Sequence, residues 1–317
     1  MLGYALRRLG IALALVWVVA TVVFLVIHVI PGDPAELLLS QGGMAPDPAA
    51  VAELRGRLGL DRPLAAQYAA YLGRLARGDL GTSLDDDHPV ADELMLRLPR
   101  TLELIGAAGL IALLAGLPAG ALAALRAGRP ADRALSGAAS LCLSIPVFVV
   151  GTLAILVLAQ QLRWMPAGGY VALARDPLQH VVLLAMPAGS IALGLGAVIF
   201  RMTRSAMLEV LGRDYVRAAA AKGLAPARIV LHHVLRGALV PIVTVLALHL
   251  GTLLGGTVLV EYLFNWPGLS GYLVRAVEAR DYPEVVGIVL AISVLAVLLN
   301  LVVDLLYAVL DPRVRHA

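Results

Sequence analysis

Six long apolar stretches with almost no charge constrain this chain more than any other feature. They run over residues 9–30, 102–125, 134–162, 181–200, 237–260 and 285–310, and their only acids are Glu103 and Asp304. A helix of roughly 20 such residues crosses a bilayer core. The stretches exceed the length of a barrel strand, show no alternation of period two, and as helices satisfy their own backbone groups in lipid. The sequence therefore predicts an all-α membrane protein with six transmembrane helices.

Composition excludes a water-soluble enzyme. Hydrophobic residues make up 60% of the chain and charged residues 15%, whereas soluble domains have about 45–50% and about 25%. The first stretch is long for a signal peptide and is followed by Pro31-Gly32-Asp33-Pro34 rather than a small-residue cleavage site. We therefore expect a retained first helix. The single cysteine, Cys142, cannot form a disulfide within the chain.

The distribution of charge predicts the orientation in the membrane. With the N-terminus in the cytoplasm, the inward segments hold 14 basic and 4 acidic residues, a net charge of +10. Residues 31–97 then lie outside with 6 arginines and 11 acids, a net charge of −5. Basic residues are enriched in cytoplasmic loops, so we expect both termini in the cytoplasm. The overall charge of +3 therefore indicates topology and not nucleic-acid binding.

Two segments between the apolar stretches are too large to be simple connectors. The external segment, residues 31–97, contains apolar residues at helical spacing over Leu64–Leu75, which predicts an amphipathic helix in a small folded subdomain. These residues are Leu64, Tyr68, Tyr71, Leu72 and Leu75.

The second segment, residues 201–236, is basic and cytoplasmic. Asp214 is a suitable N-cap for a short helix over residues 215–222, and Gly223 is suited to the left-handed position after it. Pro226 can begin the next helix. The sequence therefore predicts a helix, a tight turn and a second helix.

No pattern of catalytic or metal-binding residues occurs in the sequence. Lys222 is the only lysine and no glycine-rich run precedes it, which excludes a Walker A loop. The seven histidines have no zinc-ligand spacing. Gly268-Leu269-Ser270-Gly271 lacks the fifth residue of a nucleophile elbow and is interpreted as a turn. We expect no enzymatic activity, cofactor or metal in this chain.

The basic cytoplasmic segment resembles the signature of the membrane permeases of binding-protein-dependent ABC importers. That signature is Glu-Ala-Ala, three residues, Gly, nine residues and then Ile-x-Leu-Pro. The positions that match it are Ala218, Ala219, Gly223 and Leu235. Arg217, His233 and Arg236 stand at the Glu, Ile and Pro positions. These departures are typical of the peptide/nickel subfamily, and more narrowly of its dipeptide and oligopeptide permease B-type subunits.

The resemblance extends along essentially the whole chain. Further short motifs stand in the order of such a subunit: Ile30-Pro31-Gly32-Asp33-Pro34, Leu58-Gly59-Leu60-Asp61, Gly78-Asp79-Leu80-Gly81 with Ser83, Trp266-Pro267-Gly268-Leu269, Arg280-Asp281-Tyr282-Pro283, and Asn300-Leu301 with Asp304-Leu305 and Asp311-Pro312-Arg313. Ser270 departs from a common Gly.

The resemblance implies a type I ABC importer permease fold in a bacterial inner membrane. It divides the chain into residues 1–30 with helix 1, an external subdomain over 31–97, a permease core over 98–310 and a tail over 311–317. The implied partners are a homologous C-type permease, two ABC ATPase subunits that bind ATP and Mg, a substrate-binding protein and membrane lipid. Di- or oligopeptides are the expected cargo, and nickel chelates, glutathione and other small solutes stay open.

The resemblance also assigns the ATPase-coupling site to residues 201–236. The coupling residues are Asp214, Tyr215, Arg217, Ala218, Ala219, Lys222, Gly223 and Leu224. Small residues permit close approach to an ATPase cleft, and the surrounding arginines suit an acidic surface.

Polar residues within the apolar stretches are candidates for the pathway or for helix contacts. They are His249, Asn300 and Asp304, and we expect the last two to bind backbone or arginine partners on other helices. Gly116 with Gly120, and Gly251 with Gly255, permit close helix packing, and Pro118, Pro146 and Pro187 are candidate hinges. An ion-coupled secondary transporter is the rival class, but we find no inverted repeat and few membrane carboxylates.

Overall fold

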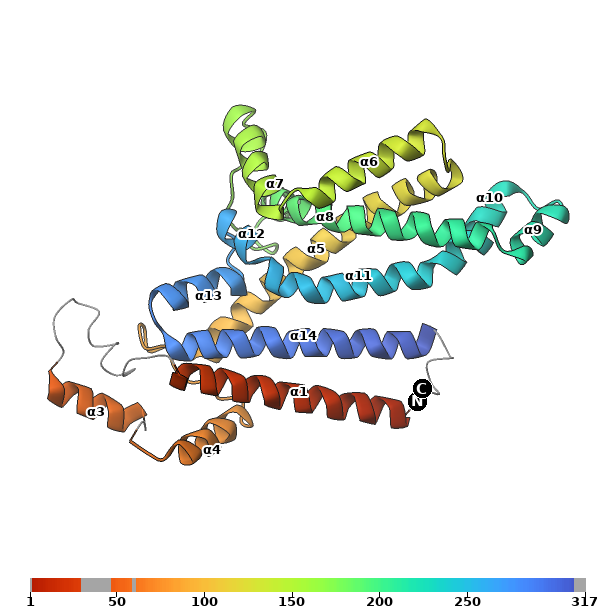
Figure 1. The fold of residues 1–317 in the computed structure, drawn as a ribbon. Coiled ribbons are helices and arrows are strands. Elements are labelled where there is room, and N and C mark those ends of the chain that lie inside the picture. The colour runs from red at the N-terminus through yellow and green to blue at the C-terminus, as the bar shows by residue number, and fades with distance from the viewer. Residues whose placement is uncertain (1, 30–46, 59–60, 311–317) are drawn as a thin grey trace. The chain divides into compact units, whose positions relative to one another are not determined.

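The computed structural model describes residues 2–29, 47–58 and 61–310, and this part of the chain is helical with one isolated bridge, between Thr82 and Pro89 (Figure 1). It divides into two compact units. Unit 1 comprises the described residues among 1–9, 97–271 and 298–317, and unit 2 those among 10–96 and 272–297. The predicted tail, 311–317, and the motif at residues 30–34 lie outside the described residues.

The helices are α1 (Leu2–Val29), α3 (Pro48–Leu58), α4 (Leu64–Leu75), α5 (Val90–Leu125), α6 (Pro130–Ser144), α7 (Val147–Ala154), α8 (Pro177–Leu211), α9 (Asp214–Ala221), α10 (Pro226–Arg228), α11 (Arg236–Gly256), α12 (Val258–Leu263), α13 (Leu269–Glu278) and α14 (Tyr282–Leu310). Two π-helical segments, η2 (Ile155–Gln161) and η3 (Ile229–Leu235), continue α7 and α10.

Five described helical segments are long and apolar enough to cross a membrane, and a sixth span is a bent pair. The pair is α6 with α7 and η2, and its two parts meet at 97°. The break has a local cause, since a residue before proline is disfavoured in the α conformation, and Ile145 before Pro146 is extended. Pro118 and Pro187 lie inside the continuous helices α5 and α8. The prediction of six spans is confirmed with the bent pair counted as one, and only Pro146 of the three prolines interrupts its helix.

Helix α8 lies at the centre of unit 1, in contact with α6, α7 and α11 (Figure 1). Its contact with α5 depends on glycine. A Cβ atom on Gly120 would come within 2.6 Å of the Phe200 carbonyl oxygen and 2.7 Å of Thr203 Cβ. Gly116 is equally close to α8, because its Cβ would lie 2.5 Å from the Gly196 carbonyl oxygen. This pair of glycines packs as the sequence predicts, and substitution at either position would force α5 away from α8.

In unit 2, the amphipathic helix α4 packs on α1. The ring of Phe24 contacts those of Tyr68 and Tyr71, with centroid distances of 5.2 and 5.4 Å. The hydroxyls of Thr21 and Tyr68 are 2.6 Å apart. The predicted helix has the predicted bounds. Leu64 is the exception among its apolar residues, because its side chain is 50% exposed.

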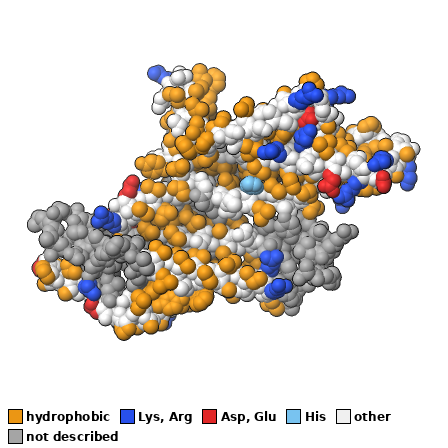
Figure 2. Space-filling view, in the orientation of Figure 1, with side chains coloured by type: hydrophobic (Ala, Val, Ile, Leu, Met, Phe, Trp, Pro, Cys, Tyr) orange, Lys and Arg blue, Asp and Glu red, His pale blue; other side chains and the backbone are white. Residues whose placement is uncertain are grey.

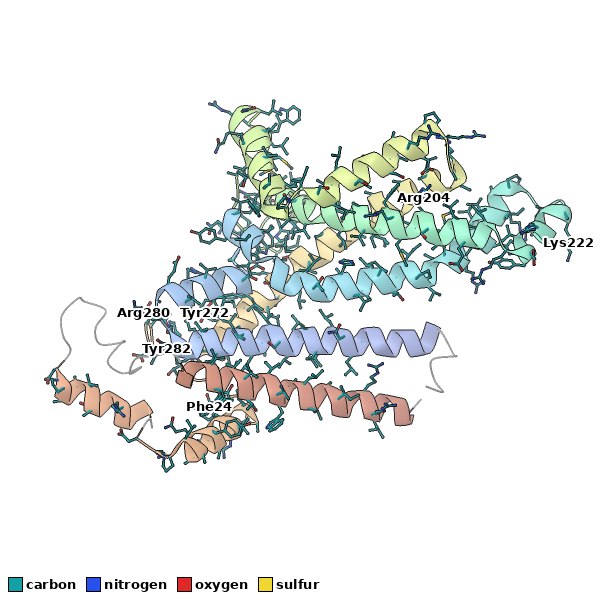
Figure 3. All side chains as sticks on the ribbon, viewed as in Figure 1. Phe24, Arg204, Lys222, Tyr272, Arg280 and Tyr282 are labelled. Atoms are coloured by element: carbon teal, nitrogen blue, oxygen red, sulfur yellow. The ribbon has the colours of Figure 1, made fainter. Side chains whose placement is uncertain are left out.

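A second contact in unit 2 joins two of the sequence motifs, one before α5 and one before α14. The buried carboxylate of Asp281 accepts hydrogen bonds from the Ser83 hydroxyl and the Leu84 amide, both at 2.7 Å. Nearby, the Tyr272 hydroxyl donates to Glu284 at 2.6 Å. Figure 3 shows Tyr272 and Tyr282 close together at this end of unit 2. The acidic turn that begins at Asp85 is thereby attached to the start of α14.

Candidate functional site

The predicted coupling segment contains a short helix, α9, that begins one residue earlier than expected. Arg213 is the extended residue before the helix, and no side chain caps the helix start. The prediction that Asp214 is the N-cap is therefore wrong. Asp214 belongs to the first turn, where its charge still favours the positive end of the helix dipole. The expected loop also begins later, because residues 201–211 continue α8.

The end of α9 is a tight turn built on Gly223. This glycine has φ +75°, a left-handed conformation that costs other residues roughly 1–2 kcal/mol. The Gly223 amide donates to the Ala220 carbonyl at 3.0 Å, and the Leu224 amide donates to the Ala219 carbonyl at 3.4 Å. These two bonds form a Schellman motif. Pro226 then occupies the first turn of α10, so the predicted sequence of helix, tight turn and helix is confirmed.

The residues of α9 and its turn divide between two faces. Val216 and Ala219 are buried and pack with residues of α8 and η3, and Leu224 packs against the same cluster. The remaining predicted coupling residues are exposed: Asp214, Tyr215, Arg217, Ala218, Lys222 and Gly223. Figure 3 shows Lys222 at the far end of unit 1. Ala219 and Leu224 therefore attach α9 to its own core, and any partner meets the other six residues.

The surface around α9 is strongly basic. Figure 2 shows Lys and Arg side chains gathered over the α5–α6 connection and over α9 and α10. Two exposed ion pairs occur there, Arg213 with Glu209 at 2.7 Å and Arg217 with Asp214 at 3.7 Å. The Glu209 carboxylate raises the pKa of Arg213. Exposed pairs contribute little to stability, and the excess of arginine leaves the surface positive.

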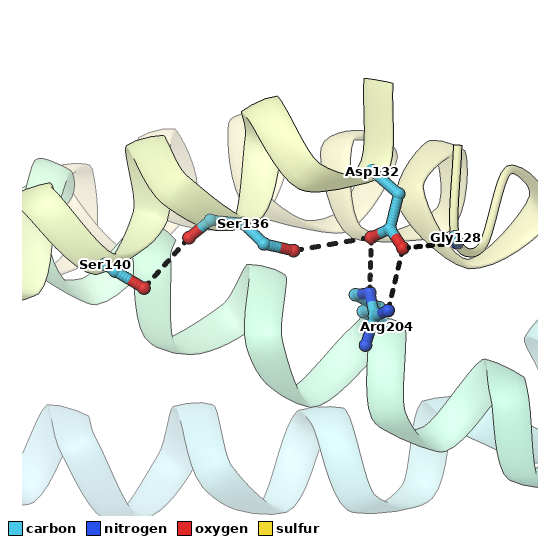
Figure 4. Close-up of polar contacts among 5 residues, drawn as sticks. All are labelled: Gly128, Asp132, Ser136, Ser140 and Arg204. Atoms are coloured by element: carbon cyan, nitrogen blue, oxygen red, sulfur yellow. Dashed lines mark hydrogen bonds and ion pairs between the residues drawn. The ribbon is translucent and has the colours of Figure 1, made fainter. Parts of the chain in front are cut away.

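An ion pair that the sequence did not reveal lies deeper in unit 1, between α6 and α8. Asp132 is only 3% exposed. The Arg204 guanidinium reaches its two carboxylate oxygens with Nε at 2.6 Å and Nη2 at 2.8 Å (Figure 4). Gly128 N–H and the Ser136 hydroxyl donate to the same carboxylate at 2.8 and 3.3 Å. The sequence gives no signal for this pairing, because its partners are 72 residues apart.

A second unpredicted carboxylate, Glu261, is fully buried beside the Trp266-Pro267-Gly268 turn. It accepts from the Thr101 hydroxyl at 2.7 Å and from the amides of Ser270 and Gly271 at 2.8 and 3.2 Å. Burial raises the pKa of this carboxyl. Gly268 is required here because a Cβ atom would overlap the carboxylate. The available sequence signal was an isolated acid directly after an apolar stretch.

Of the three predicted pathway residues, the structure describes the side chains of His249 and Asn300. His249 is half-buried on α11, and Asn300 is exposed, with its Oδ1 3.6 Å from the position of a Cβ on Gly251. The side chain of Asp304 lies outside the described residues. Within the described part of the chain, no three metal-ligating side chains form a cluster.

Two family models together match almost the entire chain. The model for the binding-protein-dependent transport system inner membrane component matches residues 116–316, and the model for the N-terminal part of such membrane components matches residues 1–105.

Several characterised permeases are similar over their full length. The di/tripeptide transport system permease protein DppB of Pseudomonas aeruginosa (strain UCBPP-PA14) is 42% identical, and the alignment covers 100% of this chain and 99% of the relative. The dipeptide transport system permease protein DppB of Escherichia coli K12 is 39% identical with the same coverage. The glutathione transport system permease protein GsiC of Escherichia coli K12 is 39% identical, with 100% of both chains covered.

A solved structure supports the fold. The crystal structure of an amino acid ABC transporter with histidines superposes with a TM-score of 0.50 and 18% identity, covering 68% of this chain and 92% of the other. At this identity the likeness concerns the fold alone.

Proposed function

The chain belongs to the family of binding-protein-dependent transport system inner membrane components, and we propose that it carries di- or oligopeptides. In this proposal it forms the translocation pathway with a second, homologous permease subunit. Two ABC ATPase subunits bind ATP and Mg and hydrolyse the ATP, while a substrate-binding protein delivers the cargo. This chain itself is non-catalytic and binds no cofactor.

One observation carries the coupling part of the proposal: a short helix, α9, is attached to the core by one face and exposes the other. Val216 and Ala219 pack in one buried cluster with residues near the end of α8. A displacement of α9 by the ATPase would therefore also displace the end of α8. The exposed Tyr215, 46% accessible, and the small side chain of Ala218 suit insertion into a cleft. The arginines around them favour an acidic ATPase surface.

The cargo proposal rests on the relatives. Two of them are named as dipeptide or di/tripeptide permeases, and one as a glutathione permease. Glutathione is itself a small peptide-like solute, so it stays the alternative cargo. We propose an inner-membrane location with both termini in the cytoplasm, because 14 of the basic residues then face inward and the acidic segment 31–97 faces outward.

The proposal is tested by transport in a reconstituted importer. We expect vesicles holding this chain, its second permease, both ATPases and the binding protein to accumulate labelled dialanine only with ATP. We expect Gly223→Trp to assemble normally but to lose receptor-stimulated ATP hydrolysis, because it places a bulky side chain at the turn of α9. The measurements are uptake of the label and ATP hydrolysis with and without liganded receptor.

Gly78→Trp is the matched control. Gly78 also has positive φ, +76°, and open space around it, but it lies after α4 in unit 2. We expect this variant to keep receptor stimulation. Normal coupling in Gly223→Trp would contradict the docking role of α9. Uptake by this chain alone, driven by an ion gradient without ATP, would instead establish a secondary transporter.

A further inference from the structure

The Asp132–Arg204 pair lies in unit 1, near the end of α8 that precedes α9. Arg204 lies on α8 seven residues before that helix ends at Leu211, which is about 10 Å along the axis. Helix α9 follows after two residues, and its Val216 and Ala219 belong to the same buried cluster as Met207 and Val210 near the end of α8. A displacement of α9 therefore acts on the end of α8, and α8 continues without a break from there to Arg204.

The other partner, Asp132, belongs to α6, whose remaining contact with α8 is apolar. The buried residues of that contact include Ala139, Ala197 and Phe200. Apolar burial is non-directional, so this contact does not by itself fix the position of α6 along α8. The two charge-assisted bonds from Arg204 to Asp132 have a fixed fork geometry. They supply the directional link that the apolar contact does not.

Helix α6 leads directly into the bend at Ile145 and Pro146, where its axis turns by 97° into α7. The Asp132 carboxylate is also fixed on its own side, because Gly128 N–H and the Ser136 hydroxyl donate hydrogen bonds to it and hold it toward Arg204 (Figure 4). We expect an apolar side chain at position 132 to keep the apolar contact of α6 with α8 and to remove this directional link.

We propose that Asp132 and Arg204 are positioning residues for transport: they transmit movement of α9, through α8, to α6 and the bent span. The proposal rests on the proposed function of α9 as the ATPase-coupling helix. It assigns to this pair no contact with cargo or nucleotide. Its role is to make α6 follow α8 when the ATPase subunits close.

The test uses the complete importer in lipid nanodiscs, with dialanine-loaded receptor. We expect Asp132→Asn to assemble but to lose receptor stimulation of ATP hydrolysis by about fivefold or more, the usual range of an allosteric coupling. We expect Arg204→Lys, which keeps the charge but not the fork, to lose part of the stimulation. The matched control is Ser140→Ala on α6, which removes an exposed hydroxyl whose hydrogen bond to the Ser136 carbonyl, 2.9 Å, stays within that helix, and it should leave stimulation unchanged.

A double variant separates transmission from simple stability. Asp132→Leu with Arg204→Met replaces the pair by apolar packing, which usually preserves or raises stability. We expect its thermal unfolding in detergent to match the wild type while receptor stimulation stays lost. Wild-type stimulation in this assembled double variant would overturn the proposal. If Gly223→Trp is uncoupled and the double variant is not, only this inference fails; if Gly223→Trp is coupled, the docking role of α9 fails first.

Discussion

Individual carboxylates organise the turns of this chain at the residue scale. Asp132, Asp281 and Glu261 are all buried, and each accepts a hydrogen bond from a backbone amide of a turn or helix start. Buried charge is tolerated when it is fully hydrogen-bonded. Only Asp132 of the three has an arginine partner in the described contacts. The other two are stabilised by amide and hydroxyl donors. Their hydrogen bonds are therefore more sensitive than those of Asp132 to protonation of the carboxyl group and to replacement of its side chain.

Substitutions of Glu261 give a prediction about the hydrogen bonds that its side chain accepts. Replacement by Ala leaves the amides of Ser270 and Gly271 without this acceptor and should cost about 3 kcal/mol of unfolding free energy. Replacement by Gln keeps an oxygen for these amides, and its NH₂ group can donate to Thr101, so the expected cost is below about 1 kcal/mol. Thermal unfolding of the purified chain in detergent measures both. Equal losses for Ala and Gln would contradict the hydrogen-bonding role.

The comparison of Glu261→Gln with the wild type also gives a prediction about how the stability of the fold depends on pH. Burial raises the pKa of Glu261 above its ordinary value, so the folded chain holds the proton more tightly than the unfolded chain. This contribution to stability is complete below the unfolded pKa and is lost as the pH rises through the folded pKa. Because Gln resembles the protonated acid, Glu261→Gln should gain stability relative to the wild type as the pH rises. A constant difference across the titration would contradict this sign.

At the scale of elements, helices were predictable where one face is apolar, and their side-chain partners were not. The spacing of Tyr68, Tyr71 and Leu75 predicted α4 because these side chains share one face and pack in one cluster with residues of α1 and α14. The turn at Gly223 was predictable because few residues adopt positive φ. The Asp214 cap failed because several residues near a helix start can take that position. The Asp132–Arg204 pair depends on the register of α6 against α8, which no local pattern encodes.

The packing of α4 on α1 gives a prediction at this scale. Tyr68→Ala removes the ring contact with Phe24 and the hydroxyl contact with Thr21. We expect a loss of about 3 kcal/mol in the stability of this contact, seen as faster hydrogen exchange in residues 64–75. Tyr68→Phe should lose only about 1 kcal/mol, the value of one hydrogen bond.

Tyr71→Phe is the matched control for that measurement. Within the described part of the chain the Tyr71 hydroxyl is buried without a hydrogen-bond partner, and burial raises its pKa to about 12. Removing this hydroxyl should therefore leave hydrogen exchange of α4 unchanged or slower. If Tyr71→Phe accelerates exchange as much as Tyr68→Ala does, the Tyr71 hydroxyl contributes to holding α4 on α1, and the effect of Tyr68→Ala cannot be assigned to its own contacts with Phe24 and Thr21.

At the scale of the whole molecule, the distribution of charge along the chain predicts the orientation in the membrane. The two compact units contain segments of opposite character: the basic surface around α9 belongs to unit 1, and residues 47–58 and 61–96 belong to unit 2. A net charge of +10 on the inward segments and −5 on residues 31–97 predicts which side of the membrane each occupies. The coupling proposal depends on this assignment, since α9 meets an ATPase only from the cytoplasm.

That assignment is tested by the accessibility of single cysteines. In a Cys142→Ser background, which has no other cysteine, we expect His88→Cys to react with a membrane-impermeant maleimide in intact spheroplasts. We expect Ala220→Cys on α9 to react only after the membrane is permeabilised. Both positions are exposed in the structure, so a difference in labelling reports the side of the membrane and not burial. Labelling of Ala220→Cys before His88→Cys would reverse the orientation, and α9 would then lie on the side of the membrane without ATP.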